Sequence, residues 1–125
     1  MLIINIKYKE INWNEFRVGP VGIKEISPDG KFVLIENTGK RGDQDISKWQ
    51  IKRKVDNEPD IIYVFPMNTI IGSGKTIKIW SRGQGRQNPP GEFVHDFDWR
   101  SGESMVTRLL SDSGEERALY SQRSQ

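Results

Sequence analysis

The chain contains no cysteine and only one histidine among its 125 residues. Without cysteine, neither a disulfide framework nor a thiolate metal site can form. No apolar run approaches the length of a membrane-spanning helix. The first residues also lack the basic segment and the long apolar core of a secretory signal peptide. We therefore expect a protein of the cytosol or the nucleus, with no membrane partner.

The chain also lacks a strong excess of charge of either sign. Lysine and arginine total 19 against 17 aspartates and glutamates, which gives a formal net charge of +2. Such a balance does not indicate a nucleic-acid-binding domain. The distribution is less even, because residues 61–91 contain no acid but carry Lys75, Lys78, Arg82 and Arg86. Short runs of this kind usually form a solvated face, and a binding patch is the alternative.

No window of helical length shows an apolar period of 3.6 residues. Instead, eight short strand-like segments are separated by turn signals, at residues 21–26, 31–36, 47–54, 61–65, 75–80, 92–95, 104–110 and 116–120. Short strands at this spacing indicate an all-β sandwich or barrel. Residues 1–19 do not follow the pattern. We interpret them as a poorly ordered leader of non-native origin, with a linker remnant or an added edge strand as alternatives.

The segment at residues 47–54 organises the predicted core. Trp49, Ile51 and Arg53 share one parity, and side chains alternate between the two faces of a strand, so Trp49 and Ile51 should enter the core. Ile77 and Ile79 share one face of another strand and join them. Arg53 points the same way. Because an unpaired buried charge is costly, we expect Arg53 to form an ion pair with a carboxylate.

Two candidate interaction surfaces follow from the same patterns. The segment at residues 31–36 is apolar on both parities, so either both of its faces are covered or the pair Phe32 and Leu34 is exposed. Lys78, Arg82 and Arg86 place positive charge on another strand and the loop after it. We predict that the domain contacts its partners through these candidate surfaces.

The apparent catalytic signals are weak. GSGKT at residues 72–76 ends like a phosphate-binding loop, but Thr69 stands where the first glycine is needed, and a strand follows where a helix is required. His95 has acids nearby but no cysteine or second histidine with which to hold a transition metal. We therefore predict no catalytic, cofactor-binding or metal-binding residue. An enzyme built around His95 or Lys75 is the weakest alternative.

The order of these pieces resembles the lamin tail domain of intermediate filament proteins. The resemblance covers about residues 20–121 and rests on GKFV at 30–33, WQIKR at 49–53, YVFP at 63–66, TIKIW at 76–80 and the prolines at 89 and 90. It implies an immunoglobulin-like β-sandwich of about eight or nine short strands, a structural role and no catalysis. Residues 122–125 would then form a short C-terminal tail.

Within that family, the chain is more similar to an invertebrate cytoplasmic intermediate filament protein than to a nuclear lamin. Residues 121–125 contain no prenylation box, and no basic import cluster precedes the domain. The resemblance implies a tail on a coiled-coil dimer that assembles into cytoplasmic filaments and contacts other filament proteins or their anchors. The alternative is a nuclear, lamin-type tail that binds chromatin or nucleic acid through the basic strand and loop.

Overall fold

The computed structural model describes the backbone of residues 2–8 and 11–124, and the side-chain burial of residues 15–123. All regular structure in these residues is β-strand. The strands are β1 Leu2–Tyr8, β2 Ile11–Arg17, β3 Val21–Ile26, β4 Phe32–Asn37, β5 Gln44–Asp45, β6 Gln50–Val55, β7 Ile61–Val64, β8 Ile70–Ile71, β9 Thr76–Trp80, β10 Glu92–Val94, β11 Ser104–Leu110 and β12 Glu116–Ser124. Within this part of the chain, no helix is long and apolar enough to cross a membrane.

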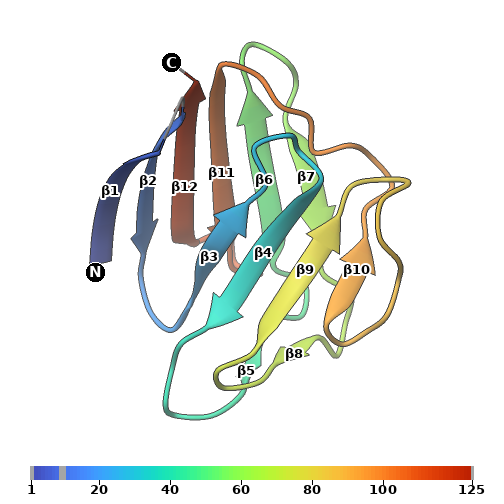
Figure 1. The fold of residues 1–125 in the computed structure, drawn as a ribbon. Coiled ribbons are helices and arrows are strands. Elements are labelled where there is room, and N and C mark those ends of the chain that lie inside the picture. The colour runs from blue at the N-terminus through green and yellow to red at the C-terminus, as the bar shows by residue number, and fades with distance from the viewer. Residues whose placement is uncertain (1, 9–10, 125) are drawn as a thin grey trace.

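The strands form two facing sheets and a short ribbon (Figure 1). The larger sheet has six strands in the order β1-β2-β12-β11-β6-β7, and the smaller has four in the order β10-β9-β4-β3. The two-residue strands β5 and β8 form the ribbon. Neighbouring strands are antiparallel except for the parallel pair β9 and β10. The predicted all-β sandwich is therefore confirmed.

Each of the eight predicted segments overlaps a strand, namely β3, β4, β6, β7, β9, β10, β11 and β12. Of the four further strands, only β1 shows alternation in its sequence, at Ile4, Ile6 and Tyr8. Residues 1–19, which we predicted to be a leader, contain β1 and β2, and β2 pairs with β12 from Arg17 to Ile11. β12 continues to Ser124, through most of the predicted C-terminal tail.

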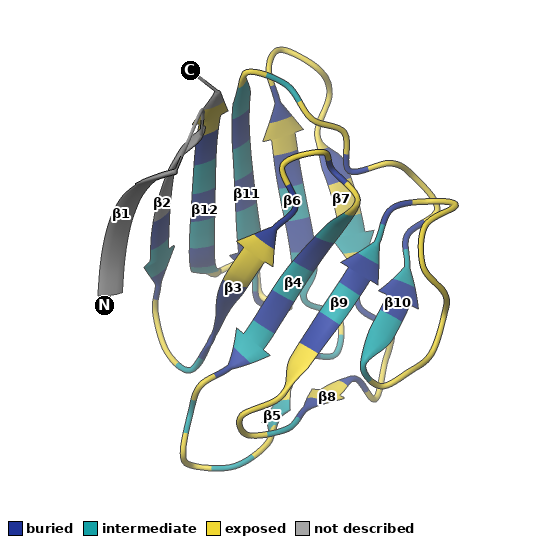
Figure 2. Ribbon diagram, in the orientation of Figure 1, coloured by how far each residue is buried: buried dark blue, intermediate teal, exposed yellow. Residues whose placement is uncertain are grey.

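The core lies between the two sheets, where buried and partly exposed residues alternate along β4, β9 and β11 (Figure 2). Val33 and Ile35 of β4 face the core, so the other two apolar residues of that strand, Phe32 and Leu34, face outward and are only half-buried. This alternation follows from the two-residue period of a strand. It places one apolar pair of β4 on the outer surface of the smaller sheet.

Candidate interaction surface

The outer face of the four-stranded sheet brings three of the five predicted surface residues together. Phe32 of β4 lies opposite Trp80 of β9, and Leu34 lies opposite Lys78. All four side chains are half-buried. Directly opposed residues on one face of an antiparallel pair have Cβ atoms about 4.5–5.5 Å apart, so these side chains form a continuous patch.

Lys78 occupies a defined position between two aromatic rings. Its Nζ lies 4.4 Å from the ring centroid of Phe32 and 4.7 Å from that of Trp80. The two rings meet edge to face, with centroids 5.7 Å apart. The indole Nε1 of Trp80 donates a hydrogen bond of 2.9 Å to Oε1 of Glu92. The ammonium is therefore held by cation–π contacts, each worth about 0.5–1 kcal/mol at an exposed site.

Arg82 and Arg86, the other two predicted surface residues, lie on the exposed connection between β9 and β10. This connection folds back onto the sheet, because Gly85 approaches Trp80 so closely that a Cβ at position 85 would overlap the indole ring. The connection that carries the two arginines therefore approaches the patch formed by Phe32, Leu34 and Lys78 at Trp80. We call these five residues the small-sheet surface.

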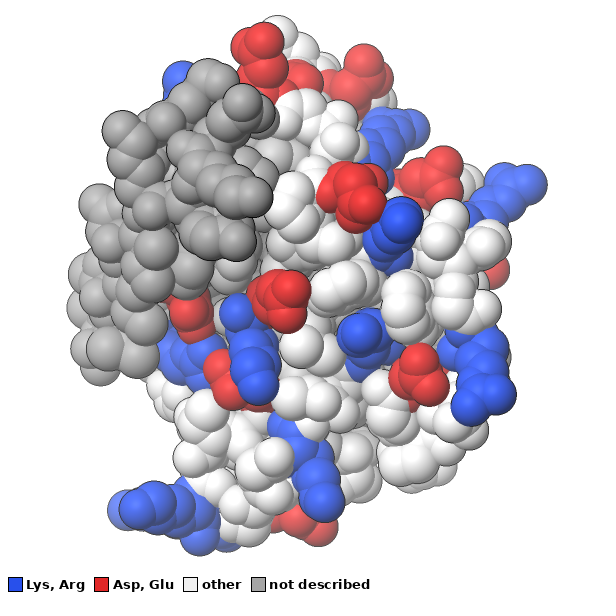
Figure 3. Space-filling model, in the orientation of Figure 1, with Lys and Arg blue, Asp and Glu red and all other residues white. Residues whose placement is uncertain are grey.

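The small-sheet surface is not a uniformly basic region. Glu92 lies beside Trp80, and Glu36 shares the outer face of β4 with Phe32 and Leu34. Figure 3 shows lysine and arginine side chains separated by acidic ones over this view of the molecule. The stretch of residues 61–91 lacks acids in sequence, but the fold brings carboxylates from neighbouring strands to it. Its local charge is therefore mixed.

The predicted core residues differ in depth. Ile51, Ile77 and Ile79 are buried in the central cluster. Trp49 packs against that cluster but remains partly exposed, and the guanidinium carbon of Arg117 lies 5.9 Å from its ring centroid. Among the tryptophans at residues 15–123, the fully buried one is Trp99, which lies in the connection between β10 and β11.

Trp99 is fixed from two directions. Its Nε1 donates to the carbonyl of Ile79 at 2.9 Å, and its backbone N–H donates to Oγ of Ser81 at 2.8 Å. Sequence analysis did not identify Trp99, because it lies outside any alternating segment.

Arg53 is fully buried, as its parity predicted, but its partners differ from our expectation. Its Nε donates to the carbonyl of Trp99 at 2.9 Å, and its Nη2 donates to the carbonyl of Arg100 at 2.9 Å. Nη1 donates to Oγ1 of Thr107 at 2.8 Å and to Oε1 of Gln122 at 3.4 Å. No carboxylate in the described part of the chain forms an ion pair with it. Desolvation lowers the pKa of Arg53 to about 10.

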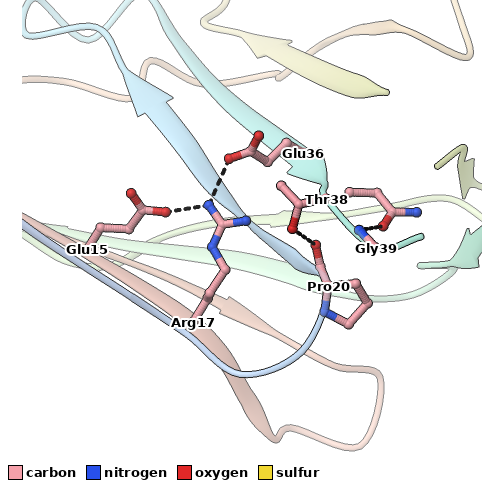
Figure 4. Close-up of polar contacts among 7 residues, drawn as sticks. Glu15, Arg17, Pro20, Glu36, Thr38 and Gly39 are labelled. Carbon is pink, nitrogen blue, oxygen red and sulfur yellow. Dashed lines mark hydrogen bonds and ion pairs between the residues drawn. The ribbon is translucent and has the colours of Figure 1, made fainter. Parts of the chain in front are cut away.

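Arg17 at the end of β2 joins the two sheets (Figure 4). One guanidinium nitrogen donates to Glu15 of the same strand and, at 2.8 Å, to Oε2 of Glu36 of β4. Burial opposes the charge, but the hydrogen bonds and the charges of the two carboxylates outweigh it and raise the pKa of Arg17. Sequence analysis missed this group because it treated residues 1–19 as a leader.

His95 is buried against the rings of Tyr63, Phe97 and Trp99. Burial lowers its pKa, while Asp96 and a hydrogen bond with the backbone of Ile62 act in the opposite direction. Its Nε2 has no hydrogen-bond partner among the described residues. In the same residues, no group of three or more histidine, cysteine, aspartate or glutamate side chains could hold a metal ion. The environment is that of a core histidine.

The GSGKT segment forms a tight turn in which Lys75 N–H donates to the carbonyl of Gly72 at 2.9 Å. Gly74 has a φ of 74°, which glycine adopts at little cost. The chain then enters β9. A strand, and not a helix N-terminus, follows this turn, so the turn lacks the geometry of a phosphate-binding loop.

Comparison with known proteins identifies one family and a consistent set of relatives. The family model described as Lamin Tail Domain matches residues 15–124. "Muscle cell intermediate filament protein OV71" of Onchocerca volvulus is 44% identical over 108 residues, which cover 85% of this chain and 25% of that protein. "Intermediate filament protein A" of Ascaris suum is 42% identical over 109 residues, covering 85% and 22%. "Intermediate filament protein ifa-3" of Caenorhabditis elegans is 42% identical over 107 residues, covering 84% and 18%. The chain thus spans a quarter or less of these relatives.

Proposed function

We propose that this chain, which belongs to the lamin tail domain family, is the tail of a cytoplasmic filament protein. The relatives described above are intermediate filament proteins. The domain is a structural component and not an enzyme. In the intact protein, a coiled-coil dimer would assemble into cytoskeletal filaments and display this sandwich along them. Its task would be to contact neighbouring filament proteins or their anchors.

The observation that carries the contact role is the organisation of the small-sheet surface. Leu34 and Phe32 present apolar area on the outer face of a sheet, and Lys78 is held between Phe32 and Trp80. Charges that are fixed before binding lose less conformational freedom when a partner arrives. A preorganised cation beside apolar side chains therefore suits a protein partner.

Cosedimentation with filaments assembled from the Ascaris suum relative tests this role. Leu34→Glu and Lys78→Glu should each reduce the fraction of the isolated domain that pellets with the filaments. Met67→Ser is the matched control, because Met67 is 60% exposed and lies outside the small-sheet surface. Thermal melting of each variant establishes that it is folded. Equal pelleting of all four proteins would contradict the proposal.

A nucleic-acid-binding tail of the nuclear type is the second candidate. It is favoured by the acid-free sequence of residues 61–91, which carries Lys78, Arg82 and Arg86. Fluorescence anisotropy of a labelled DNA duplex, at low and at near-physiological salt, distinguishes the two candidates. Binding that survives physiological salt and disappears when the three charges are reversed would favour the nuclear tail. A signal restricted to low salt would favour the filament tail, because nonspecific phosphate contacts weaken steeply with salt.

A further inference from the structure

The outer face of the six-stranded sheet, on the opposite side of the molecule, contains a hollow that no function above uses. It has a volume of about 380 Å³ and is lined by Lys52, Lys54, Asp60, Arg108, Leu110 and Glu116. These residues come from β6, β11, β12 and the approach to β7. Three cations and two carboxylates line it, so its charge is positive by one.

The centre of this hollow holds two like charges opposite each other. Lys52 of β6 is the direct cross-strand neighbour of Arg108 of β11. Like charges in that position destabilise a sheet. Each has one acidic partner at the rim: Lys52 Nζ lies 3.6 Å from Asp60, and Arg108 Nε lies 2.8 Å from Glu116. These side chains are about 40% exposed, and ion pairs at such exposure contribute at most about 1 kcal/mol.

Positive charge at the hollow remains available to a ligand. Lys54 is exposed and forms no ion pair in the described part of the chain. It lies opposite Val106, two residues from Arg108 on the same face of β11. Arg108 uses its Nε for Glu116, so its terminal guanidinium nitrogens can donate to another carboxylate. A carboxylate between these cations would relieve their repulsion.

Apolar side chains flank the cations on both sides. One cross-strand row runs from Ile62 through Lys52, Arg108 and Leu119 to Phe16. A neighbouring row places Val64 beyond Gln50 and Leu110. Ile62 and Val64 are each 46% exposed, which is unusual for β-branched apolar residues on a strand. The face therefore offers apolar area at both ends and positive charge in the middle.

We propose that this surface, the large-sheet surface, binds an acidic segment of a partner protein that carries carboxylates flanked by apolar residues. Asp60 and Glu116 at the rim disfavour a continuous phosphate backbone, because its charges would meet theirs. The excess of positive charge favours an acidic ligand over a basic or neutral one. This proposal does not depend on the small-sheet surface, which is formed by the other sheet.

The test uses fluorescence anisotropy with a labelled peptide of alternating glutamate and leucine. A peptide with glutamine in place of glutamate is the matched ligand control. The domain should bind the acidic peptide more tightly than the neutral one, and the affinity should fall as salt is added. The double variant Lys54→Gln/Arg108→Gln should bind the acidic peptide about tenfold more weakly, as expected for loss of one or two charge-assisted hydrogen bonds.

Further variants separate the proposed site from general electrostatics. Lys24→Gln removes an exposed lysine of β3, on the other sheet, and should leave peptide affinity unchanged. Ile62→Ser should weaken binding without changing charge. Leu34→Glu, in the small-sheet surface, should leave peptide affinity unchanged. The two proposals can therefore fail independently of each other. Thermal melting controls for folding in each case.

Three outcomes would overturn the proposal. The first is equal peptide affinity of Lys54→Gln/Arg108→Gln and the folded wild type. The second is displacement of the peptide by a DNA duplex at near-physiological salt, which would identify a nucleic-acid surface. The third is self-association of the wild type that the double variant abolishes, which would identify a second copy of this chain as the occupant.

Discussion

Two arginines are buried in this domain, and their charges are stabilised in different ways. Arg53 lies in the six-stranded sheet at 0% exposure and donates to the carbonyls of Trp99 and Arg100, each at 2.9 Å. Arg17 lies at 8% exposure and donates to two carboxylates, those of Glu15 and Glu36. Desolvation lowers the pKa of Arg53 to about 10, whereas the carboxylates raise that of Arg17.

The difference shows what each side chain organises. The planar guanidinium of Arg53 fixes the backbone of residues 99 and 100 against β6, β11 and β12, in directions set by its rigid fork. Uncharged acceptors are sufficient for Arg53, because its role is to position the connection that contains residues 99 and 100. Arg17 instead joins β2 of one sheet to β4 of the other through charge, with opposing charge on both strands. Any replacement of Arg53 should therefore be costly. Arg17 should be replaceable if Glu15 and Glu36 are replaced by neutral residues together with it.

The largest effect should come from Arg53→Ala. It leaves one buried carbonyl, one partly buried carbonyl and the Thr107 hydroxyl without this donor and opens a cavity, so the free energy of unfolding should fall by about 3–5 kcal/mol. Urea denaturation followed by tryptophan fluorescence measures this. Arg82→Ala, at an exposed position, should change stability by at most about 0.5 kcal/mol. A loss of about 1 kcal/mol or less for Arg53→Ala would remove the distinction between the two arginines.

Arg17→Met should have a smaller effect, because Glu36 is partly accessible to water. The variant leaves two carboxylates close together without their cation, and we expect a loss of about 1–3 kcal/mol. The triple variant Glu15→Gln/Arg17→Met/Glu36→Gln removes all three charges and should recover most of that loss, since replacing a whole buried ion group by neutral residues is often close to neutral. Urea denaturation of the three proteins compares them. No recovery in the triple variant would mean that Arg17 acts through its shape, as Arg53 does.

Gly22→Ala tests the geometry of the Arg17 group without changing a charge. A Cβ at position 22 would overlap the guanidinium of Arg17, which lies flat against β3. The substitution should displace Arg17 from its carboxylates and destabilise the domain by about 1 kcal/mol. In an Arg17→Met background the same substitution should cost much less, so a double-mutant cycle should give a clear coupling energy. Additive effects would show that the arginine moves aside at no cost.

The two arginines also mark how far the sequence could predict this structure. Period-two alternation located eight strands and the inward parity of Arg53, because burial of one face is a local pattern. Two of the partners of Arg53 are backbone carbonyls, which every residue has, so the sequence carried no signal for them. Glu15 and Arg17 lie in the larger sheet because β2 pairs with β12, whereas Glu36 lies in the smaller sheet, on β4. The three residues therefore meet only once the two sheets pack together, and local sequence patterns do not report that packing.

The candidate surface was predictable to a similar degree. The alternation of β4 placed Phe32 and Leu34 on one face but left open whether that face is exposed, and the alternation of β9 placed Lys78 on the face opposite Ile77 and Ile79. Neither pattern specifies strand order, so the cation–π contacts of Lys78 and the approach of Glu92 from β10 could not be foreseen. The same limit hid the large-sheet surface. Lys52 and Arg108 are 56 positions apart and become neighbours only through strand pairing.

The smallest predicted effect is a loss of stability at low pH that His95 causes near Trp99 and Arg53. His95 packs against Trp99, whose carbonyl accepts a hydrogen bond from Arg53. Burial lowers the pKa of His95 below its ordinary value of 6.5, so the unfolded chain binds the proton more readily than the folded one. This contribution to stability is therefore complete above pH 6.5 and is lost as the pH falls from 6.5 towards the folded-state pKa.

Urea denaturation of the wild type and of His95→Gln, between about pH 8 and about pH 5, measures this contribution. Carboxylates titrate in both proteins, so the difference between the two curves isolates the histidine. The wild type should lose stability relative to His95→Gln as the pH falls below 6.5. Adding Arg17→Met to both proteins should leave that difference unchanged, because Arg17 is in contact with neither His95 nor Trp99. If the stability of the wild type and that of His95→Gln change with pH in the same way, His95 accepts a proton in the folded domain as readily as in the unfolded chain. A second positive charge near Arg53 would then be tolerated.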